Sequence, residues 1–326
     1  MELIRIDKES GIPLIGCIAF GIIDRRTNLL QIRPTTVCNL NCVYCSTDSG
    51  AYSQRHNVNY VVDKDWLIEW IKEVVKYKGE NDIEANMDSV GEVLTHPNIV
   101  EIIKEIKKIE QVKKISMQTN GSLLDANMLR KLEKAGLNHI NLSINAIDCD
   151  IARAMSGIPA YNVNKILDCA KEIVKSGIEL MITPVWVPGL NDNEMPKIIA
   201  FAKEIGAKLG VQKYEVHKFG RKPKKAKEVN YWKFYNQLSK WEKEFNVKLK
   251  LGPRDFEIHK AKSVPILFEK WDKISVDLKC HGWMKGQMIG ISKNRCITLH
   301  NCAAEKGNVR AKIIENANNI YTAEVL

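Results

Sequence analysis

The chain has 326 residues, of which 45% are hydrophobic and 27% charged, so it can form one large α/β domain or two domains and is too apolar for a disordered protein. Its net charge of +10 favours a polyanionic partner, although a lysine-rich solvated surface explains the charge equally well. The apolar run at residues 12–23 is too short to span a bilayer, and charges of both signs precede it, unlike in a secretory signal. We therefore expect a cytoplasmic protein without a membrane partner, in which this run is a buried strand or hairpin.

From about residue 29 to 245, short β-rich segments alternate with amphipathic segments of helical period. The predicted strands lie at residues 29–35, 82–88, 113–119, 139–145, 179–187 and 209–216. The predicted helices lie at residues 63–78, 96–109, 125–136, 164–177, 193–206 and 231–245. Gly136, Gly177 and Gly206 stand where helix C-caps are expected. Six successive β/α units predict parallel strands with right-handed crossovers, either as an open sheet or, as we favour, as a partial (β/α)6 barrel.

The character of the sequence changes after residue 250. Alternating apolar residues and frequent Gly and Asn turns replace the helical period there and predict a small antiparallel β-barrel. We expect an N-terminal strand or hairpin extension at residues 1–28, a β/α domain at 29–250 and a barrel domain at 262–326. A basic linker with six Lys or Arg residues at 218–227 precedes the last predicted helix.

Several chemically useful residues follow the ends of predicted strands. Cys38, Gly91, Asn120 and Asn145 each stand at such a position. Ligands of parallel α/β folds bind where strands end and the βα loops begin. We therefore expect these four residues to converge on one mouth.

The chain contains nine cysteines, and three of them, Cys38, Cys42 and Cys45, have Cys-x3-Cys-x2-Cys spacing. In a reducing compartment such thiols serve as metal ligands, catalytic groups or core residues. A structural zinc site needs four ligands and a redox dithiol only two. Three thiolates suit an iron–sulfur cube whose fourth iron stays open. We favour the cube, while a zinc site and incidental buried cysteines stay open as alternatives.

This cysteine motif, with Tyr44 before its last cysteine, resembles the signature of the radical S-adenosylmethionine (SAM) superfamily. The resemblance extends through the β/α region and is strongest to the subgroup that includes the molybdenum-cofactor biosynthesis cyclase and peptide-modifying enzymes. It implies that Cys38, Cys42 and Cys45 hold one [4Fe-4S] cluster and that SAM chelates the open iron. An electron from a reductant such as ferredoxin or flavodoxin would then break the S–C5′ bond, and the 5′-deoxyadenosyl radical would take a hydrogen from the substrate.

The same resemblance implies a set of SAM contacts. The family's Gly-Gly-Glu-Pro segment corresponds to residues 90–93, where Gly91 and Glu92 are kept and both flanking residues are valine. A carboxylate such as Glu92 suits the SAM ammonium group. Tyr44 is expected to belong to the same cofactor site.

Polar residues at two further strand ends complete the expected cofactor site. Asn120 belongs to a Thr-Asn-Gly turn, and turn geometry alone also explains its residue type. Ser143 and Asn145 are two residues apart and so face the same side of a strand. There they would contact the SAM carboxylate and ribose.

The C-terminal segment, residues 286–326, resembles a TRAM domain, the small barrel that many RNA-modifying enzymes append. Together with the charge of +10, it favours RNA, most of all tRNA, as the substrate. The alternative is a peptide or a small molecule of cofactor biosynthesis, with a barrel that only stabilises the protein. The expected substrate contacts are Gln212, Tyr214, Arg221, Lys222, Lys224 and Lys225.

Overall fold

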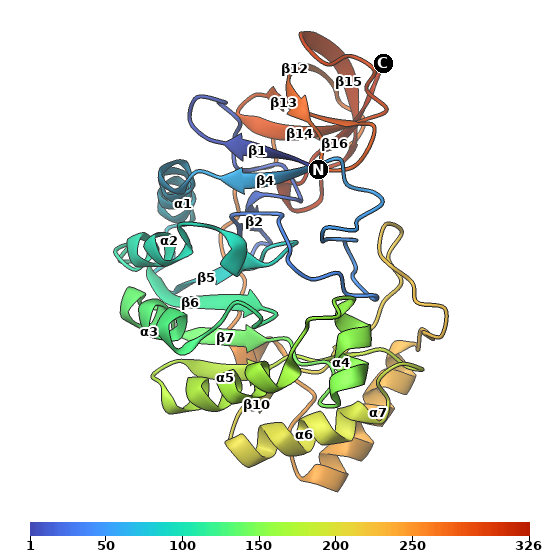
Figure 1. The fold of residues 1–326 in the computed structure, drawn as a ribbon. Helices are drawn as coiled ribbons and strands as arrows, with labels where there is room; N and C mark the ends of the chain where they lie inside the picture. The colour runs from blue at the N-terminus through green and yellow to red at the C-terminus, as the bar shows by residue number, and fades with distance from the viewer. The chain divides into compact units, whose positions relative to one another are not determined.

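The computed structural model describes residues 1–326 (Figure 1). The chain forms two compact units. Unit 1 comprises Met1–Val37, Gln54–Ile115 and His259–Leu326, and unit 2 comprises Cys38–Ser53 and Ser116–Ile258. No helix is long and apolar enough to cross a membrane.

The α/β part of unit 1 contains two small groups of strands. β2 (Gly21–Asp24) runs antiparallel to β3 (Leu29–Arg33), and β3 runs parallel to β5 (Ile83–Met87). A separate parallel pair consists of β1 (Glu2–Ile6) and β4 (Val58–Val62). The helical elements of this part are α1 (Lys64–Lys78), the 3-10 turn η1 (Val93–Thr95) and α2 (Ile99–Ile106).

The C-terminal part of unit 1 is a closed β-barrel with strand order β12-β13-β14-β16-β15. Its elements are β12 (Lys273–His281), β13 (Gln287–Ser292), β14 (Arg295–His300), β15 (Asn308–Glu315), the 3-10 turn η3 (Ala317–Asn319) and β16 (Thr322–Val325). Its strands pair antiparallel except for β14 and β16, which are parallel. The buried side chains of Val276, Leu299, Ile313 and Tyr321 belong to its core. A five-stranded barrel confirms the prediction for this segment.

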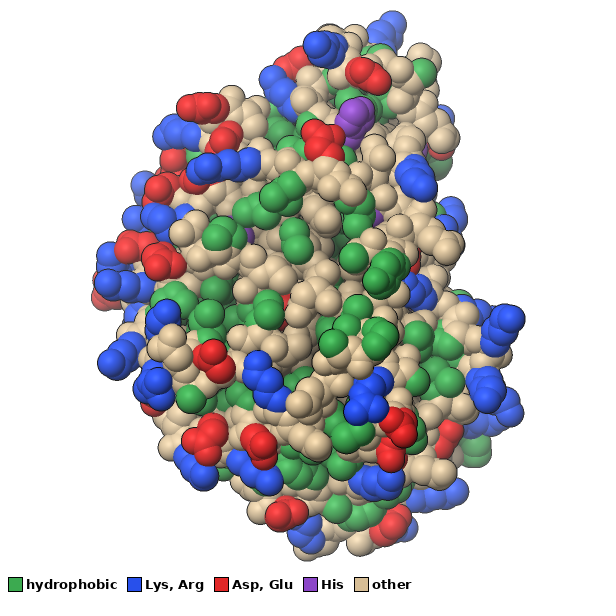
Figure 2. All heavy atoms as spheres, in the orientation of Figure 1, with side chains coloured by type: hydrophobic (Ala, Val, Ile, Leu, Met, Phe, Trp, Pro, Cys, Tyr) green, Lys and Arg blue, Asp and Glu red, His purple; other side chains and the backbone are tan.

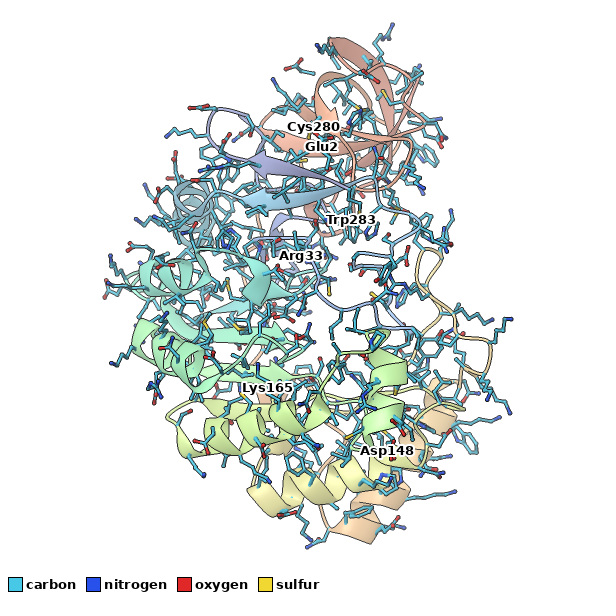
Figure 3. The ribbon with its side chains drawn as sticks, in the orientation of Figure 1. Glu2, Arg33, Asp148, Lys165, Cys280 and Trp283 are labelled. Atoms are coloured by element: carbon cyan, nitrogen blue, oxygen red, sulfur yellow. The ribbon has the colours of Figure 1, made fainter.

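The barrel is built into unit 1 through backbone and ring contacts. Cys296 donates its backbone N–H to the carbonyl of Ile15, and Tyr321 donates to Gly16. Trp283, labelled in Figure 3, follows β12. Its ring lies 3.9 Å from the ring of His56. The run at residues 12–23 is mostly buried, as expected, but only its last three residues join a strand.

Unit 2 contains parallel strands in the order β6-β7-β8-β10. These strands are β6 (Val112–Thr119, which crosses the boundary of the units), β7 (His139–Leu142), β8 (Glu179–Ile182) and β10 (Lys208–Leu209). A short parallel pair, β9 (Val185–Trp186) and β11 (Gln212–Lys213), continues beyond them. The helices are α3 (Ala126–Ala135), α4 (Cys149–Ser156), α5 (Val163–Lys175), α6 (Glu194–Ile205), α7 (Tyr231–Phe245) and the 3-10 turn η2 (Pro253–Phe256).

The parallel strands confirm the predicted fold class.

Local sequence explains several helix ends. Helix α4 begins after Asp148, whose carboxylate accepts hydrogen bonds from backbone N–H groups of the first turn. Gly136 and Gly206 are left-handed C-caps as predicted. The prediction for Gly177 was wrong, because α5 ends at Lys175 and its C-cap is Ser176, which has an extended backbone.

Candidate active site

The three clustered cysteines lie on the cysteine loop, residues 38–50 of unit 2. Its backbone is tied to the end of α4, because Asn41 and Val43 donate to the carbonyls of Ser156 and Met155 over 2.9 and 3.0 Å. Gly157 has φ +66°, and a Cβ there would lie 2.2 Å from the carbonyl oxygen of Asn41. Only glycine permits this approach. The end of α4 therefore fixes the first half of the loop.

All three cysteines are half-buried, and none of them forms a disulfide bond. The sulfur of Cys45 lies 3.4 Å from the backbone N–H of Ser49 and 3.3 Å from the Thr47 hydroxyl. Burial is the main cause that raises the pKa of the Cys42 thiol to about 12, and the negative charge of a Cys45 thiolate is the second. A metal must therefore displace a proton to bind Cys42 at neutral pH.

The donor set of the cysteine loop suits an iron–sulfur cube. No three Cys, His, Asp or Glu side chains converge as the ligands of one metal ion. In an iron–sulfur cube each thiolate holds a different iron, so the three thiolates need not converge on one point. The half-buried thiols on one fixed loop therefore fit the cube.

Arg221 supports this loop from within. Its Nε donates to Asp48 Oδ1 over 2.6 Å, one Nη donates to the Cys42 carbonyl over 3.0 Å, and the other donates to the Ser49 carbonyl over 2.8 Å. Its backbone N–H donates to the carbonyl of Cys45 over 2.8 Å. The sequence predicted a substrate contact here and gave no signal for this structural role.

Asn120 also serves the cysteine loop. Its Nδ2 donates to Asn39 Oδ1 over 3.1 Å, and Asn39 Nδ2 donates to the Ser122 hydroxyl over 2.8 Å. The Asn120 Oδ1 accepts the Ser122 N–H over 2.9 Å. These hydrogen bonds join the turn after β6 to Asn39, the residue next to Cys38. The sequence did not predict this contact, because Asn39 belongs to no motif.

Ser143 and Asn145 follow β7 in unit 2. Asn145 Oδ1 accepts the N–H of Val185 over 2.8 Å, and its carbonyl accepts from Asn191 Nδ2 over 2.9 Å. The side-chain oxygen of Asn145 is therefore engaged with β9, and its Nδ2 remains available. The Ser143 side chain is half-buried, and its hydroxyl has no hydrogen-bond partner within the protein, so it can bind a ligand.

Gly91 and Glu92 belong to unit 1. A Cβ at Gly91 would lie 2.2 Å from the carbonyl oxygen of Val37, so the chain next to the cysteine loop leaves no room for a side chain. The Glu92 N–H donates to that carbonyl over 2.8 Å. The Glu92 side chain is buried, and its Oε1 accepts the Leu94 N–H over 3.1 Å. A buried carboxylate is thereby held at the end of β5.

The remaining predicted substrate contacts differ in exposure. Gln212 is exposed on β11, whereas Tyr214 is buried and its hydroxyl donates to the Arg221 carbonyl over 3.3 Å. Lys222, Lys224 and Lys225 are exposed in the segment before α7. Figure 2 shows Lys and Arg side chains along the edge where this segment lies in Figure 1. Their contact with a substrate stays a prediction.

A family model described as "Radical SAM superfamily" matches residues 32–202. The chain belongs to the radical SAM superfamily. An uncharacterized protein of Methanocaldococcus jannaschii is 38% identical over 97% of this chain and 79% of its own length. A probable GTP 3′,8-cyclase of the same organism is 31% identical over 57% of this chain and 59% of its own length. The chain therefore spans little more than half of that cyclase.

Two solved structures share this fold. HydG, an FeFe-hydrogenase maturase from Carboxydothermus hydrogenoformans, has a TM-score of 0.54 at 15% identity over 70% of this chain and 55% of its own. Streptococcus suis SuiB bound to SAM has a TM-score of 0.52 at 14% identity over 75% of this chain and 52% of its own. The cofactors of this radical SAM protein are a [4Fe-4S] cluster and SAM.

Proposed function

We propose that this cytoplasmic protein reductively cleaves SAM at a [4Fe-4S] cluster to a 5′-deoxyadenosyl radical and uses it to modify RNA, with tRNA as the expected substrate. Cys38, Cys42 and Cys45 hold the cluster, and a ferredoxin or flavodoxin supplies the electron. The cofactor carries out the difficult bond cleavage, while the protein positions SAM and excludes competing reactions.

The polar residues described above take distinct roles in this proposal. The buried carboxylate of Glu92 receives the SAM ammonium group beside Gly91. Ser143 and the free side of the Asn145 amide bind the carboxylate and ribose of SAM. Tyr44 packs against the apolar cluster of unit 2 that includes Met155 and Tyr214. In this proposal that packing holds the cysteine loop at the cofactor site. Asn120 orients the same loop through Asn39.

The observation that favours RNA is an exposed aromatic ring at the barrel. Trp271 is 59% exposed, and the ammonium groups of Lys270 and Lys312 lie 4.7 and 5.3 Å from its ring centroid. An exposed indole can stack on an unpaired base, and lysines beside it can contact the adjoining phosphates. In this proposal the barrel is a TRAM-like module that holds the RNA, and the lysines before α7 add further phosphate contacts.

The decisive experiment measures 5′-deoxyadenosine formed from SAM by the anaerobic, reduced holoprotein, with and without total tRNA. Stimulation by tRNA supports the proposal. Trp271→Ala should remove most of the stimulation, whereas Trp232→Ala, which changes an exposed tryptophan of α7 in the other unit, should not. Product formation that tRNA leaves unchanged would contradict the RNA assignment.

The similarity to a probable GTP 3′,8-cyclase favours a second candidate, a small molecule of cofactor biosynthesis. The same assay tests it when GTP replaces tRNA. Stimulation by GTP alone would favour this candidate, and a precursor peptide would be the next substrate to test if neither had an effect.

A further inference from the structure

Unit 2 contains a cavity of about 270 Å³ whose lining residues lie outside the cysteine loop. One wall is a face of the parallel strands, and the other is α7 with the segment that follows it. The residues that carry the argument are Gln118, Asn141, Thr183, Gln212, Phe234 and Leu249. We call this cavity the strand-face pocket.

The strand wall of the pocket follows from strand register. Gln118 of β6 pairs with Asn141 of β7, which in turn pairs with Met181 of β8. Side chains of paired residues lie on the same face of a sheet, and this face recurs every second residue. Leu142, one residue further along, instead contacts the helix side, since a Cβ on Gly121 would meet both Leu142 and Ile166 of α5. The pocket therefore lies on the face opposite α5.

One polar group of this wall is buried without a partner. Thr183 is 5% exposed, and its hydroxyl has no hydrogen-bond partner. A buried polar group is rarely left unsatisfied, because its lost hydration then has no compensation. The Thr183 hydroxyl therefore indicates a ligand. The side-chain amides of the half-buried Gln118 and the exposed Gln212 make no hydrogen bond within the protein and are available to the same ligand.

Asn141 lies between Gln118 and Met181 in the strand register, and its side chain is held by His139 of the same strand. His139 Nδ1 lies 2.8 Å from Glu179 Oε2, and His139 Nε2 lies 3.0 Å from Asn141 Oδ1. The amide of Asn141 therefore cannot turn freely, and one of its polar groups remains for the pocket. An amide fixed in this way favours ligands whose hydrogen-bonding group meets it in one direction.

The lining also defines the charge and shape of the ligand. No Lys, Arg, Asp, Glu or His side chain lines the pocket. A charged group would find no counter-ion among the lining side chains, which disfavours its binding relative to a neutral group. The opposite wall is apolar, with Phe234 and Leu249 among its members. Since pockets for drug-sized ligands begin at about 300 Å³, this one suits a single flat ring.

The pocket lies beside the residues assigned to SAM in the proposed function. Ser143 is two residues beyond Asn141 on the same face, a separation of about 7 Å along a strand. Gly210 also lines the pocket, and a Cβ there would lie 2.8 Å from the Met181 sulfur, so this position has no space for a larger residue. With Ser143 in contact with SAM, as in the proposed function, a ring held in the pocket would lie next to the cofactor.

We propose that the strand-face pocket binds the uncharged heteroaromatic ring of the substrate, a nucleobase, by pairing its polar edge with Gln118, Asn141, Thr183 and Gln212. This inference rests on the proposed function for the origin of the base, an unpaired nucleotide of RNA. The base must leave its stack to enter, as for other enzymes that act on bases.

The test uses the full-length holoprotein without SAM and measures binding of free adenine, guanine, cytosine and uracil by ligand-observed NMR. Orotate, which adds a carboxylate to the uracil ring, serves as the charged probe. At least one neutral base should bind, and orotate should bind at least about tenfold more weakly than uracil, or not at all. Binding of none of the four bases would overturn the proposal, as would equal binding of uracil and orotate.

Two variants locate the binding. Thr183→Val keeps the shape of the side chain but removes its hydroxyl, and should weaken binding about five- to tenfold. Gly210→Ala reduces the volume against the flexible end of Met181 and should also weaken binding. Thr298→Val makes the same change in the barrel of unit 1 and should leave binding unchanged. Equal base binding by the wild type and both pocket variants would overturn the assignment.

The outcomes for the pocket and for the RNA proposal are separable. If tRNA stimulates SAM cleavage but no base binds, the RNA function stands and the pocket assignment fails. If bases bind and Thr183→Val weakens them while tRNA has no effect, the pocket assignment stands and the substrate is a smaller molecule that contains the ring.

Discussion

Arg221 Nε and Asp48 Oδ1 form a 2.6 Å ion pair inside the cysteine loop, joining residues that are 173 positions apart in the sequence. The Arg221 side chain also donates to the backbone carbonyls of Cys42 and Ser49. Because charge-assisted bonds of a planar guanidinium fix geometry as well as contribute energy, Arg221 sets the shape of the loop before any cluster is bound.

Replacing Arg221 by methionine should therefore loosen the cysteine loop without unfolding unit 2. The variant should lose its iron–sulfur absorbance at least about tenfold faster in the presence of a chelator, which corresponds to ~1.4 kcal/mol in the barrier. Lys222→Met removes a neighbouring exposed charge and serves as the matched control. Equal rates of cluster loss in the two variants would show that Arg221 does not stabilise the site.

Cys42→Ala tests the ligand assignment itself. An iron held by the Cys42 thiolate loses its protein ligand in this variant, so the anaerobically reconstituted protein should lack the brown absorbance of the wild type. Cys149→Ala changes another half-buried cysteine, at the start of α4, and should keep it. Wild-type iron and sulfide content in Cys42→Ala would contradict the assignment.

The cysteine motif could be found from sequence because its chemistry is local. Cys38, Cys42 and Cys45 are separated by only a few residues, so their spacing alone restricts the metal. The partners of the loop could not be found in this way. Arg221 reaches it through tertiary folding, and no periodic pattern marks a side chain that bonds to distant carbonyls.

Secondary structure shows the same division. The long amphipathic helices such as α1 and α6 were predicted close to their observed bounds, because their buried residues recur at the helical period. The eight-residue helix α4 and the strand β4 were not predicted as elements. Both are short, and β4 depends on pairing with β1 at the far N-terminus. Their stability comes from neighbours more than from local propensity.

Glu92→Gln tests the carboxylate proposed to bind the SAM ammonium group. The amide keeps the size of the side chain and can still accept the Leu94 N–H, so the backbone turn should persist. Loss of the charge should weaken SAM binding about tenfold or more, because hydrogen bonds to charged groups contribute about 1.5–3 kcal/mol. Equilibrium dialysis with labelled SAM measures the affinity, and iron content serves as the internal control. Unchanged affinity with a full cluster would remove Glu92 from the cofactor site.

Glu194 gives unit 2 a defined dependence on pH. Its buried carboxylate accepts the N–H groups of Ile147 and Asp148 over 2.7 and 2.8 Å and pairs with Lys197. Burial alone would raise the pKa of Glu194, but the Asp148 N–H and the Lys197 ammonium outweigh it and lower this pKa. The stabilisation is therefore fully present above the unfolded-state pKa of about 4.3 and is lost as the pH falls through the lower folded-state pKa.

Glu194→Gln should accordingly lower the urea midpoint at pH 7 and make the midpoint depend less on pH between neutral and acidic solution. Glu172→Gln, which changes an exposed glutamate paired with Lys175 on α5, should change the midpoint little at any pH, because exposed ion pairs contribute about 0–1 kcal/mol. Urea unfolding followed by circular dichroism at pH 7 and pH 4 makes the comparison. Parallel pH profiles for the wild type and Glu194→Gln would show that this carboxylate has the same pKa in the folded and unfolded chain.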